Sequence, residues 1–168
     1  MQPNAFKPLV GLRLSIIRRA ADMLVLAFGT IRPHPSGTGT GTVGEYALHV
    51  QCPWRLDGPA ETITGWDDLF EYGGAGERPP NWSYEDGGSL QDARLDDLFG
   101  PREPATRSWV NEDDRLVVTD AEQTGRGDVR IELTGGYAIL LFPASCKLEA
   151  WRLFVPGAGA HLVFPAPD

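Results

Sequence analysis

The sequence predicts an α+β domain dominated by antiparallel β-structure, a sandwich or half-barrel with one or two short helices in an insertion. Three observations predict this class. Residues 128–142 alternate apolar and polar side chains as far as Gly135-Gly136 and then run apolar, the pattern of a β-hairpin. Twenty glycines and fourteen prolines in 168 residues favour short strands and turns over long helices. Short stretches with period two recur along the chain, without an internal repeat or a domain boundary, so residues 1–168 are expected to form a single domain.

The hairpin also suggests a register. Gly135 and Gly136 are predicted to form a two-residue loop, because glycine tolerates the positive φ of tight hairpin turns. Four cross-strand pairs follow: Thr134 with Tyr137, Leu133 with Ala138, Ile131 with Leu140, and Val129 with Phe142. This register would place Val129, Ile131 and Leu133 on one apolar face with Ala138, Leu140 and Phe142.

Residues 9–31 predict a pair of strands on either side of the polar stretch 18–22. A helix through Leu12, Ile16, Ala20 and Leu24 is the alternative, and periodicity alone does not decide between them. Pro8 and the β-branched residues favour strands.

The next segments predict a loop and then a strand. Residues 32–44 carry two prolines and a Gly-Thr alternation, and we expect a loop there. Residues 45–56 predict a strand with Tyr46, Leu48 and Val50 on one side, and Pro53 predicts an edge or a bend.

An insertion is predicted at roughly residues 57–107. Thr64 is expected to cap one short helix that carries acidic residues in its first turn. Ser89 is expected to cap a second, which Gly100-Pro101 ends. Further strands are predicted at residues 115–119, 150–155 and 161–164.

The net charge of −8 is unevenly distributed. Residues 66–120 contain fourteen acidic residues against five arginines, so this segment carries −9 and the remainder of the chain +1. Binding to nucleic acid is therefore not expected, because neutralising phosphates needs a cationic surface. A concentrated acidic surface would instead attract a basic protein, although solubility is the simpler explanation for it.

Candidate partner-binding residues lie in the same segment. Tryptophan in a loop offers a large contact area at low entropic cost, and neighbouring carboxylates would supply the charge. The predicted contact residues are Trp66, Asp67, Asp68, Trp82, Asp96, Asp97 and Trp109. The alternative is that the three indole rings clamp a long loop onto the sheet.

Catalytic and cofactor signals are weak. His49 and Cys52 would form a site in an enzyme only with partners brought from elsewhere, and zinc binding would need Cys146 and His161 as well. Neither arrangement has a local motif. No cofactor and no metal are expected, and buried cysteine is the simpler interpretation.

Composition also suggests a location. No apolar run approaches the roughly 20 residues of a membrane span, and residues 1–9 lack the features of a secretory signal. Two cysteines indicate a reduced compartment. We therefore expect a cytoplasmic protein without membrane contact.

Three stretches carry a resemblance to known proteins: Arg19-Ala20-Ala21-Asp22-Met23 leading into Phe28-Gly29, residues 46–55 (YALHVQCPWR), and residues 150–156 (AWRLFVP) followed by His161-Leu162-Val163. Together they resemble a family of uncharacterised small cytoplasmic bacterial proteins, common in actinobacteria. The Gly-Gly-Tyr hairpin followed by a Trp-Arg-Leu-Phe strand is also similar to immunity proteins of polymorphic-toxin systems. The resemblance covers most of the chain outside residues 57–107 and brings no catalytic residue with it.

We therefore expect a non-enzymatic protein-binding module. The specific expectation is an immunity protein that neutralises a basic toxin through its acidic surface. The alternatives are an enzyme that uses Cys52 and His49, and a small-molecule binding module between the sheet and the insertion.

Overall fold

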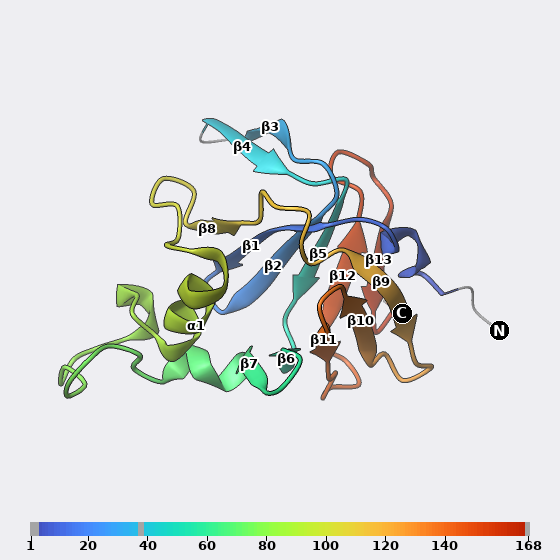
Figure 1. The fold of residues 1–168 in the computed structure, drawn as a ribbon. Helices are drawn as coiled ribbons and strands as arrows, with labels where there is room; N and C mark the ends of the chain where they lie inside the picture. The colour runs from blue at the N-terminus through green and yellow to red at the C-terminus, as the bar shows by residue number, and fades with distance from the viewer. Residues whose placement is uncertain (1–3, 37–38, 167–168) are drawn as a thin grey trace.

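The computed structural model describes residues 4–36 and 39–166, which form one domain of antiparallel strands (Figure 1). The main strands form two open sheets. The six-stranded sheet has the order β13-β12-β5-β2-β1-β8, and the five-stranded sheet has the order β7-β6-β11-β10-β9. Every neighbouring pair in both sheets is antiparallel. The predicted fold class, dominated by antiparallel β-structure, is confirmed.

The strands of the six-stranded sheet are β1 (Leu14–Ala20), β2 (Met23–Phe28), β5 (Tyr46–Val50), β8 (Ser108–Val110), β12 (Trp151–Phe154) and β13 (His161–Phe164). Those of the five-stranded sheet are β6 (Trp54–Asp57), β7 (Thr62–Gly65), β9 (Val118–Gln123), β10 (Val129–Leu133) and β11 (Tyr137–Leu141). A separate hairpin joins β3 (Arg32–Ser36) to β4 (Gly39–Val43). The helical elements are the 3₁₀ turns η1 (Lys7–Leu9), η2 (Trp66–Phe70) and η3 (Tyr84–Asp86) and the helix α1 (Leu90–Phe99).

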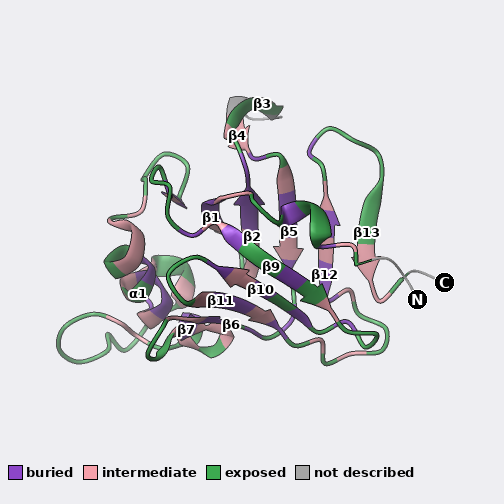
Figure 2. Cartoon of the chain, turned by 45° about the vertical axis from the view of Figure 1, so that its right-hand side comes forward, coloured by how far each residue is buried: buried purple, intermediate pink, exposed green. Residues whose placement is uncertain are grey.

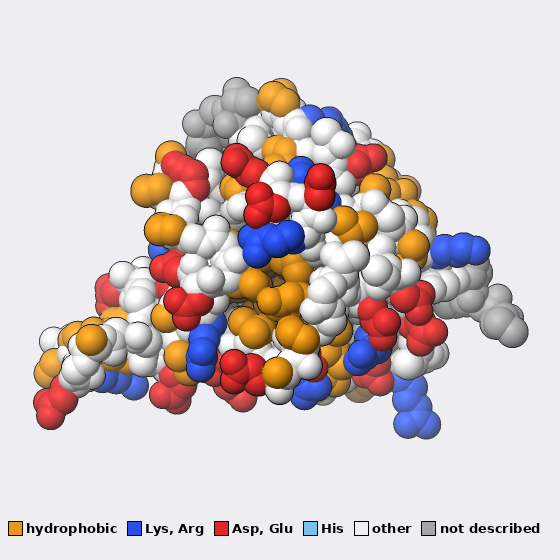
Figure 3. All heavy atoms as spheres, viewed as in Figure 1, with side chains coloured by type: hydrophobic (Ala, Val, Ile, Leu, Met, Phe, Trp, Pro, Cys, Tyr) orange, Lys and Arg blue, Asp and Glu red, His pale blue; other side chains and the backbone are white. Residues whose placement is uncertain are grey.

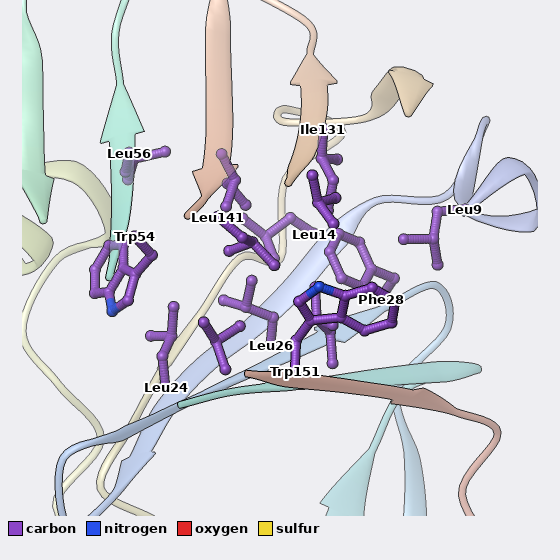
Figure 4. Packing of buried hydrophobic residues seen from close by; sticks show 14 of the residues in the cluster. Leu9, Leu14, Leu24, Leu26, Phe28, Trp54, Leu56, Ile131, Leu141 and Trp151 are labelled. Atoms are coloured by element: carbon purple, nitrogen blue, oxygen red, sulfur yellow. The ribbon is translucent and has the colours of Figure 1, made fainter. Parts of the chain in front are cut away.

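The core lies between the two sheets. Alternate residues of β2 point into it, so that Leu24, Leu26 and Phe28 are each at most 2% exposed. They meet Leu56 and Leu141 from the other sheet (Figure 4). Buried residues follow the inner faces of the strands, and exposed ones gather on the loops and on β3 (Figure 2). Face-to-face packing of this kind gives each sheet the apolar partner it needs.

The chain changes sheets where the sequence places Pro53. The predicted strand over residues 45–56 is two strands: β5 belongs to the six-stranded sheet and β6 to the five-stranded one. The predicted bend is confirmed. Tyr46, Leu48 and Val50 contact the core, and Trp54 follows on β6 at 5% exposure.

The pair of strands predicted over residues 9–31 is also confirmed, as β1 and β2. Their turn consists of Ala21 and Asp22, and Ala21 adopts φ 54°. The predicted register of the C-terminal hairpin is wrong by one residue. Leu133 pairs with Tyr137, Ile131 with Ile139, and Val129 with Leu141.

The reason for this shift is a three-residue loop, Thr134-Gly135-Gly136, in place of the predicted two-residue loop. Both glycines have positive φ, 82° and 80°. Thr134 leaves the hairpin ladder because its N–H donates to the carbonyl of Val117, 2.8 Å away, on the connection into β9. Ile139 and Leu141 are therefore buried, and Phe142, predicted to be inside, is 39% exposed.

Three other predictions need correction. Residues 32–44 contain the β3–β4 hairpin where a loop was predicted. Proline has no N–H to donate to a neighbouring strand. Pro33 and Pro35 alternate along β3, so both can occupy positions whose N–H would point away from β4. The strand predicted at residues 115–119 begins at Val118, after Leu116 adopts φ 56°. The first predicted helix is the short 3₁₀ turn η2, whose N-cap is Gly65, since Thr64 belongs to β7.

The second predicted helix, α1, is confirmed. The Ser89 hydroxyl accepts a hydrogen bond from the Asp92 N–H at 3.0 Å, and Gly100 ends the helix with φ 83°. Strands β12 and β13 lie where the sequence predicts them.

Candidate functional site

Residues 66–88, here called the arm, form the most prominent projection of the molecule. The arm begins with η2, extends away from both sheets at the lower left of Figure 1, and returns through η3 to α1. Its base is closed by backbone hydrogen bonds, from Gly73 N–H to the Gly88 carbonyl at 2.9 Å and from Leu90 N–H to the Glu71 carbonyl at 2.7 Å. Closed ends and a long excursion are typical of an Ω-loop, a class that often carries function.

The arm is held together by its own side chains. The Trp82 Nε1–H donates to the Gly87 carbonyl at 2.8 Å, and the indole ring packs edge-to-face with Tyr72 at 5.5 Å. The guanidinium of Arg78 lies over the same indole, 5.1 Å from the ring centroid. These contacts connect three parts of the arm, around residues 72, 78 and 82–87, to one another.

A row of aromatic rings connects the arm to the body. Trp66 packs partly against the core and contacts Phe70, with ring centroids 6.5 Å apart. Phe70 in turn meets Tyr84 edge-to-face at 5.5 Å. Phe70 is 42% exposed, and Trp66, Tyr72, Trp82 and Tyr84 are each partly exposed. The arm thus presents five aromatic side chains to solvent.

The arm is also acidic. Six carboxylates and one arginine give it a net charge of −5, and every one of these acidic residues except Asp68 is exposed. Asp68 caps η2 by accepting hydrogen bonds from the Thr64 hydroxyl at 2.9 Å and the Gly65 N–H at 3.1 Å. Asp67, its neighbour, is exposed.

The acidic segment 66–120 as a whole is not one surface, and this corrects the expected concentration of charge. Within this segment α1 contacts both η2 of the arm and β8, whereas β9, which carries Asp120, lies at the edge of the five-stranded sheet opposite β7. Acidic side chains on the face seen in Figure 3 lie at its top and at both its margins as well as on the arm.

The other predicted contact residues lie elsewhere. Asp96 and Asp97 are exposed on α1, which packs beside η2. Asp96 Oδ1 accepts hydrogen bonds from Trp109 Nε1 at 2.8 Å and from the Arg102 N–H at 3.2 Å. Trp109 itself lies on β8 with 2% exposure and belongs to the core, so it is not a contact residue. This ring clamps the segment onto the sheet, the alternative that the sequence left open.

A second polar feature was not predicted from the sequence. Asp92 on α1 is buried and ion-pairs with Arg19 of β1, and a second guanidinium, that of Arg102, lies 3.8 Å from the same carboxylate oxygen. Burial by itself would raise the pKa of Asp92, but the hydrogen bond from Arg19, the positive charges of Arg19 and Arg102 and the Ser89 N–H hold it below its usual value. We call Arg19, Asp92, Arg102 and Trp109 the arginine cluster.

The candidate nucleophile is buried. Cys52 is 4% exposed within the core, and burial raises the pKa of its thiol to about 11. At neutral pH this thiol is therefore protonated, and a protonated thiol is a poor nucleophile. His49 lies on the opposite side of the six-stranded sheet, where its ring packs edge-to-face with Phe154 at 4.9 Å. The geometry does not bring the two together for catalysis.

The four residues considered for zinc are likewise not assembled. Cys146 is exposed, and His161 stacks on Phe154 and contacts Arg152. Within residues 4–36 and 39–166, no three His, Cys, Asp or Glu side chains are grouped as metal ligands. No helix in this part of the chain has both the length and the apolar character needed to cross a membrane.

Comparison with known proteins gives no matching family model, no matching curated protein and no matching solved structure.

The sequence located Trp66, Asp67 and Trp82 on the arm but missed Phe70, Tyr72 and Tyr84, which complete its aromatic surface. The only signal was the density of aromatic residues between Trp66 and Tyr84. Nothing in the sequence connects Arg19 with Arg102, because the strand order alone brings β1 next to β8.

Proposed function

We propose that the chain is a non-enzymatic protein-binding module and that the arm is its contact surface for a basic protein partner. The observation that carries the proposal is the exposure of five aromatic rings on a projection with a net charge of −5. Aromatic side chains dominate the energy of protein interfaces, because they bury much area and lose little side-chain entropy. The surrounding carboxylates would speed the encounter with a cationic surface.

The arm is also preorganised, which reduces the cost of binding. Trp82 is already fixed by its hydrogen bond to Gly87 and by its contacts with Tyr72 and Arg78. Fewer side chains need to be ordered on association, and more of the interaction energy remains as affinity.

Within this class we propose toxin neutralisation in the cytoplasm as the specific role. The support is the sequence resemblance to immunity proteins together with the acidic arm, since nuclease toxins are commonly basic. An inhibitor that approaches such a toxin with an acidic projection can cover the cationic substrate site.

The test is affinity capture from the source cells with the wild-type chain and with a charge-reversed arm, Asp67→Lys with Glu71→Lys. The matched control is Asp120→Lys with Glu122→Lys, which reverses two exposed carboxylates on β9, outside the arm. We expect wild type and control to retain a basic partner, and the arm variant to bind it with an association rate at least tenfold slower at low salt. Equal, salt-independent rates for all three proteins would reject the arm as the contact surface.

The alternative enzyme makes a different prediction. A catalytic Cys52 would react quickly with iodoacetamide at neutral pH, whereas the burial of its thiol predicts modification of Cys146 alone in the native protein. Mass spectrometry of the alkylated peptides distinguishes the two outcomes.

A further inference from the structure

We propose that a hollow beside the arginine cluster is a binding site for a phosphoryl group, either free or as the ester of a small molecule. The hollow has a volume of about 310 Å³. Its lining comes from three segments far apart in the chain: Arg19 and Ala21 at the β1–β2 turn, Tyr84 and Glu85 on the arm, and Arg102 and Arg107 on the α1–β8 connection.

The first argument is an uncompensated positive charge. The two oxygens of Asp92 already accept hydrogen bonds from Arg19 and from the Ser89 N–H. The Arg102 guanidinium is left at 3.8 Å from one of them, beyond hydrogen-bond distance. Asp96 accepts only from the backbone N–H of Arg102 and from Trp109. The donors of the Arg102 side chain therefore remain available to a ligand at the edge of the hollow.

The second argument is that an aromatic ring holds Arg102 in place, in addition to the charge of Asp92. Its guanidinium lies over the ring of Trp109, 5.3 Å from the centroid, and its side chain is 25% exposed. Arg19 lies against the same ring at 5.4 Å. Because the indole is part of the core, it fixes the two cations close together against their mutual repulsion. Such a preorganised guanidinium fork binds an oxyanion at little entropic cost.

The third argument is a further cation among the residues that line the hollow. Arg107 is exposed, and no carboxylate within residues 4–36 and 39–166 lies at ion-pair distance from it. With Glu85 and Asp92 included, the three arginines leave this site with a charge of +1, although all of these residues except Arg19 come from the acidic segment 66–120.

The placement of these cations favours phosphate over carboxylate. The two oxygens of a carboxylate lie in one plane and are suited to a single guanidinium fork. The oxygens of a phosphoryl group point in tetrahedral directions, so one group can accept from two arginines, Arg102 and Arg107, at the same time. The Tyr84 hydroxyl is a further potential donor on the arm side.

The experiment is calorimetric titration of the full chain with inorganic phosphate, glycerol phosphate and acetate at constant ionic strength. The variants are Arg102→Gln and Arg107→Gln, with Arg94→Gln as the matched control, because Arg94 is an exposed arginine on α1 that does not line the hollow. Glu85→Gln removes a repulsive carboxylate from the site. Circular dichroism checks that each variant is folded. If Arg102→Gln is not folded, the comparison of Arg107→Gln with Arg94→Gln decides the test.

We expect saturable binding of phosphate that is at least about tenfold tighter than that of acetate. Arg102→Gln and Arg107→Gln should each weaken it about tenfold or more, Glu85→Gln should strengthen it, and Arg94→Gln should leave it unchanged. Equal or tighter binding of glycerol phosphate would assign the site to an ester, and weaker binding would assign it to free phosphate. Absence of saturable binding, or equal losses in the Arg94 and Arg107 variants, would overturn the proposal.

Discussion

The two-sheet body and the arm reach a defined structure by different means. In the body, alternate strand residues bury large apolar side chains between the sheets, and Trp151 illustrates the result at 1% exposure. In the arm, partly exposed aromatic rings contact one another and backbone carbonyls, above a base closed by hydrogen bonds. We therefore expect the body to supply most of the stability of the chain, because little of the core depends on the arm. This leaves the arm available for the recognition role proposed above.

The largest expected effect is in the body, for Trp151→Ala. The indole stacks on Phe164 at 5.6 Å, meets Phe6 edge-to-face at 5.1 Å, and donates to the Gly127 carbonyl at 2.8 Å. Its removal leaves a cavity and an unpaired carbonyl, so urea denaturation should show a loss of about 3–5 kcal/mol in the free energy of unfolding.

Trp82→Ala is the matched substitution in the arm. It removes the same side chain from a partly exposed position, and we expect a loss of no more than about 1 kcal/mol. Equal losses for the two variants would show that the arm is part of the cooperative core and would contradict the division proposed above.

The next effect lies at the boundary between the two regions, in the Asp92→Asn variant. This change leaves the Arg19 guanidinium, which is 9% exposed, without its carboxylate, and should cost about 3 kcal/mol at neutral pH. The folded pKa of Asp92 is depressed, so its contribution is complete above the unfolded pKa and is lost as the pH falls through the folded value.

The difference in unfolding free energy between wild type and Asp92→Asn should therefore shrink below about pH 4, near the ordinary pKa of aspartate. Urea denaturation between pH 2 and 7 measures it, with Asp97→Asn as the exposed control. A difference that stays constant down to the acid end would show that the charge of Asp92 is not what stabilises the fold.

A smaller effect is expected when most of the arm is removed. Because the Gly73 N–H bonds to the Gly88 carbonyl, residues 74–87 can be replaced by Asn-Gly, a two-residue hairpin turn. The lost contacts lie mostly within the arm, and the shorter loop lowers the entropy of closure, so the free energy of unfolding should change by less than about 1 kcal/mol. The same variant should lose the protein partner, while a cooperative urea transition confirms that the body is intact.

Prediction from the sequence succeeded where a local pattern decides the structure and failed where contacts between distant segments decide it. Period-two patterns located β1, β2, β5 and β10 to β13, because one buried face imposes alternation, and the Ser89 capping box located α1. The register of the β10–β11 hairpin was wrong because a tertiary hydrogen bond, from Thr134 to Val117, decides the loop length. Trp109 was misplaced because its burial depends on the pairing of β8 with β1, which no local pattern encodes. The arginine cluster escaped prediction for the same reason.

The smallest expected effect tests whether burial or charge determines how much an ion pair stabilises the fold. Arg130 and Glu132 on β10 form a pair at 2.9 Å with side chains about half exposed, whereas Arg19 and Asp92 are both below 10%. A double-mutant cycle with Arg130→Ala and Glu132→Ala should give a coupling energy of no more than about 0.5 kcal/mol, and less in 1 M NaCl. Solvent already stabilises both charges at this site, so little is gained by pairing them. A coupling as large as the loss in Asp92→Asn would mean that proximity alone stabilises ion pairs in this protein, and the contrast between its buried and exposed regions would lose its physical basis.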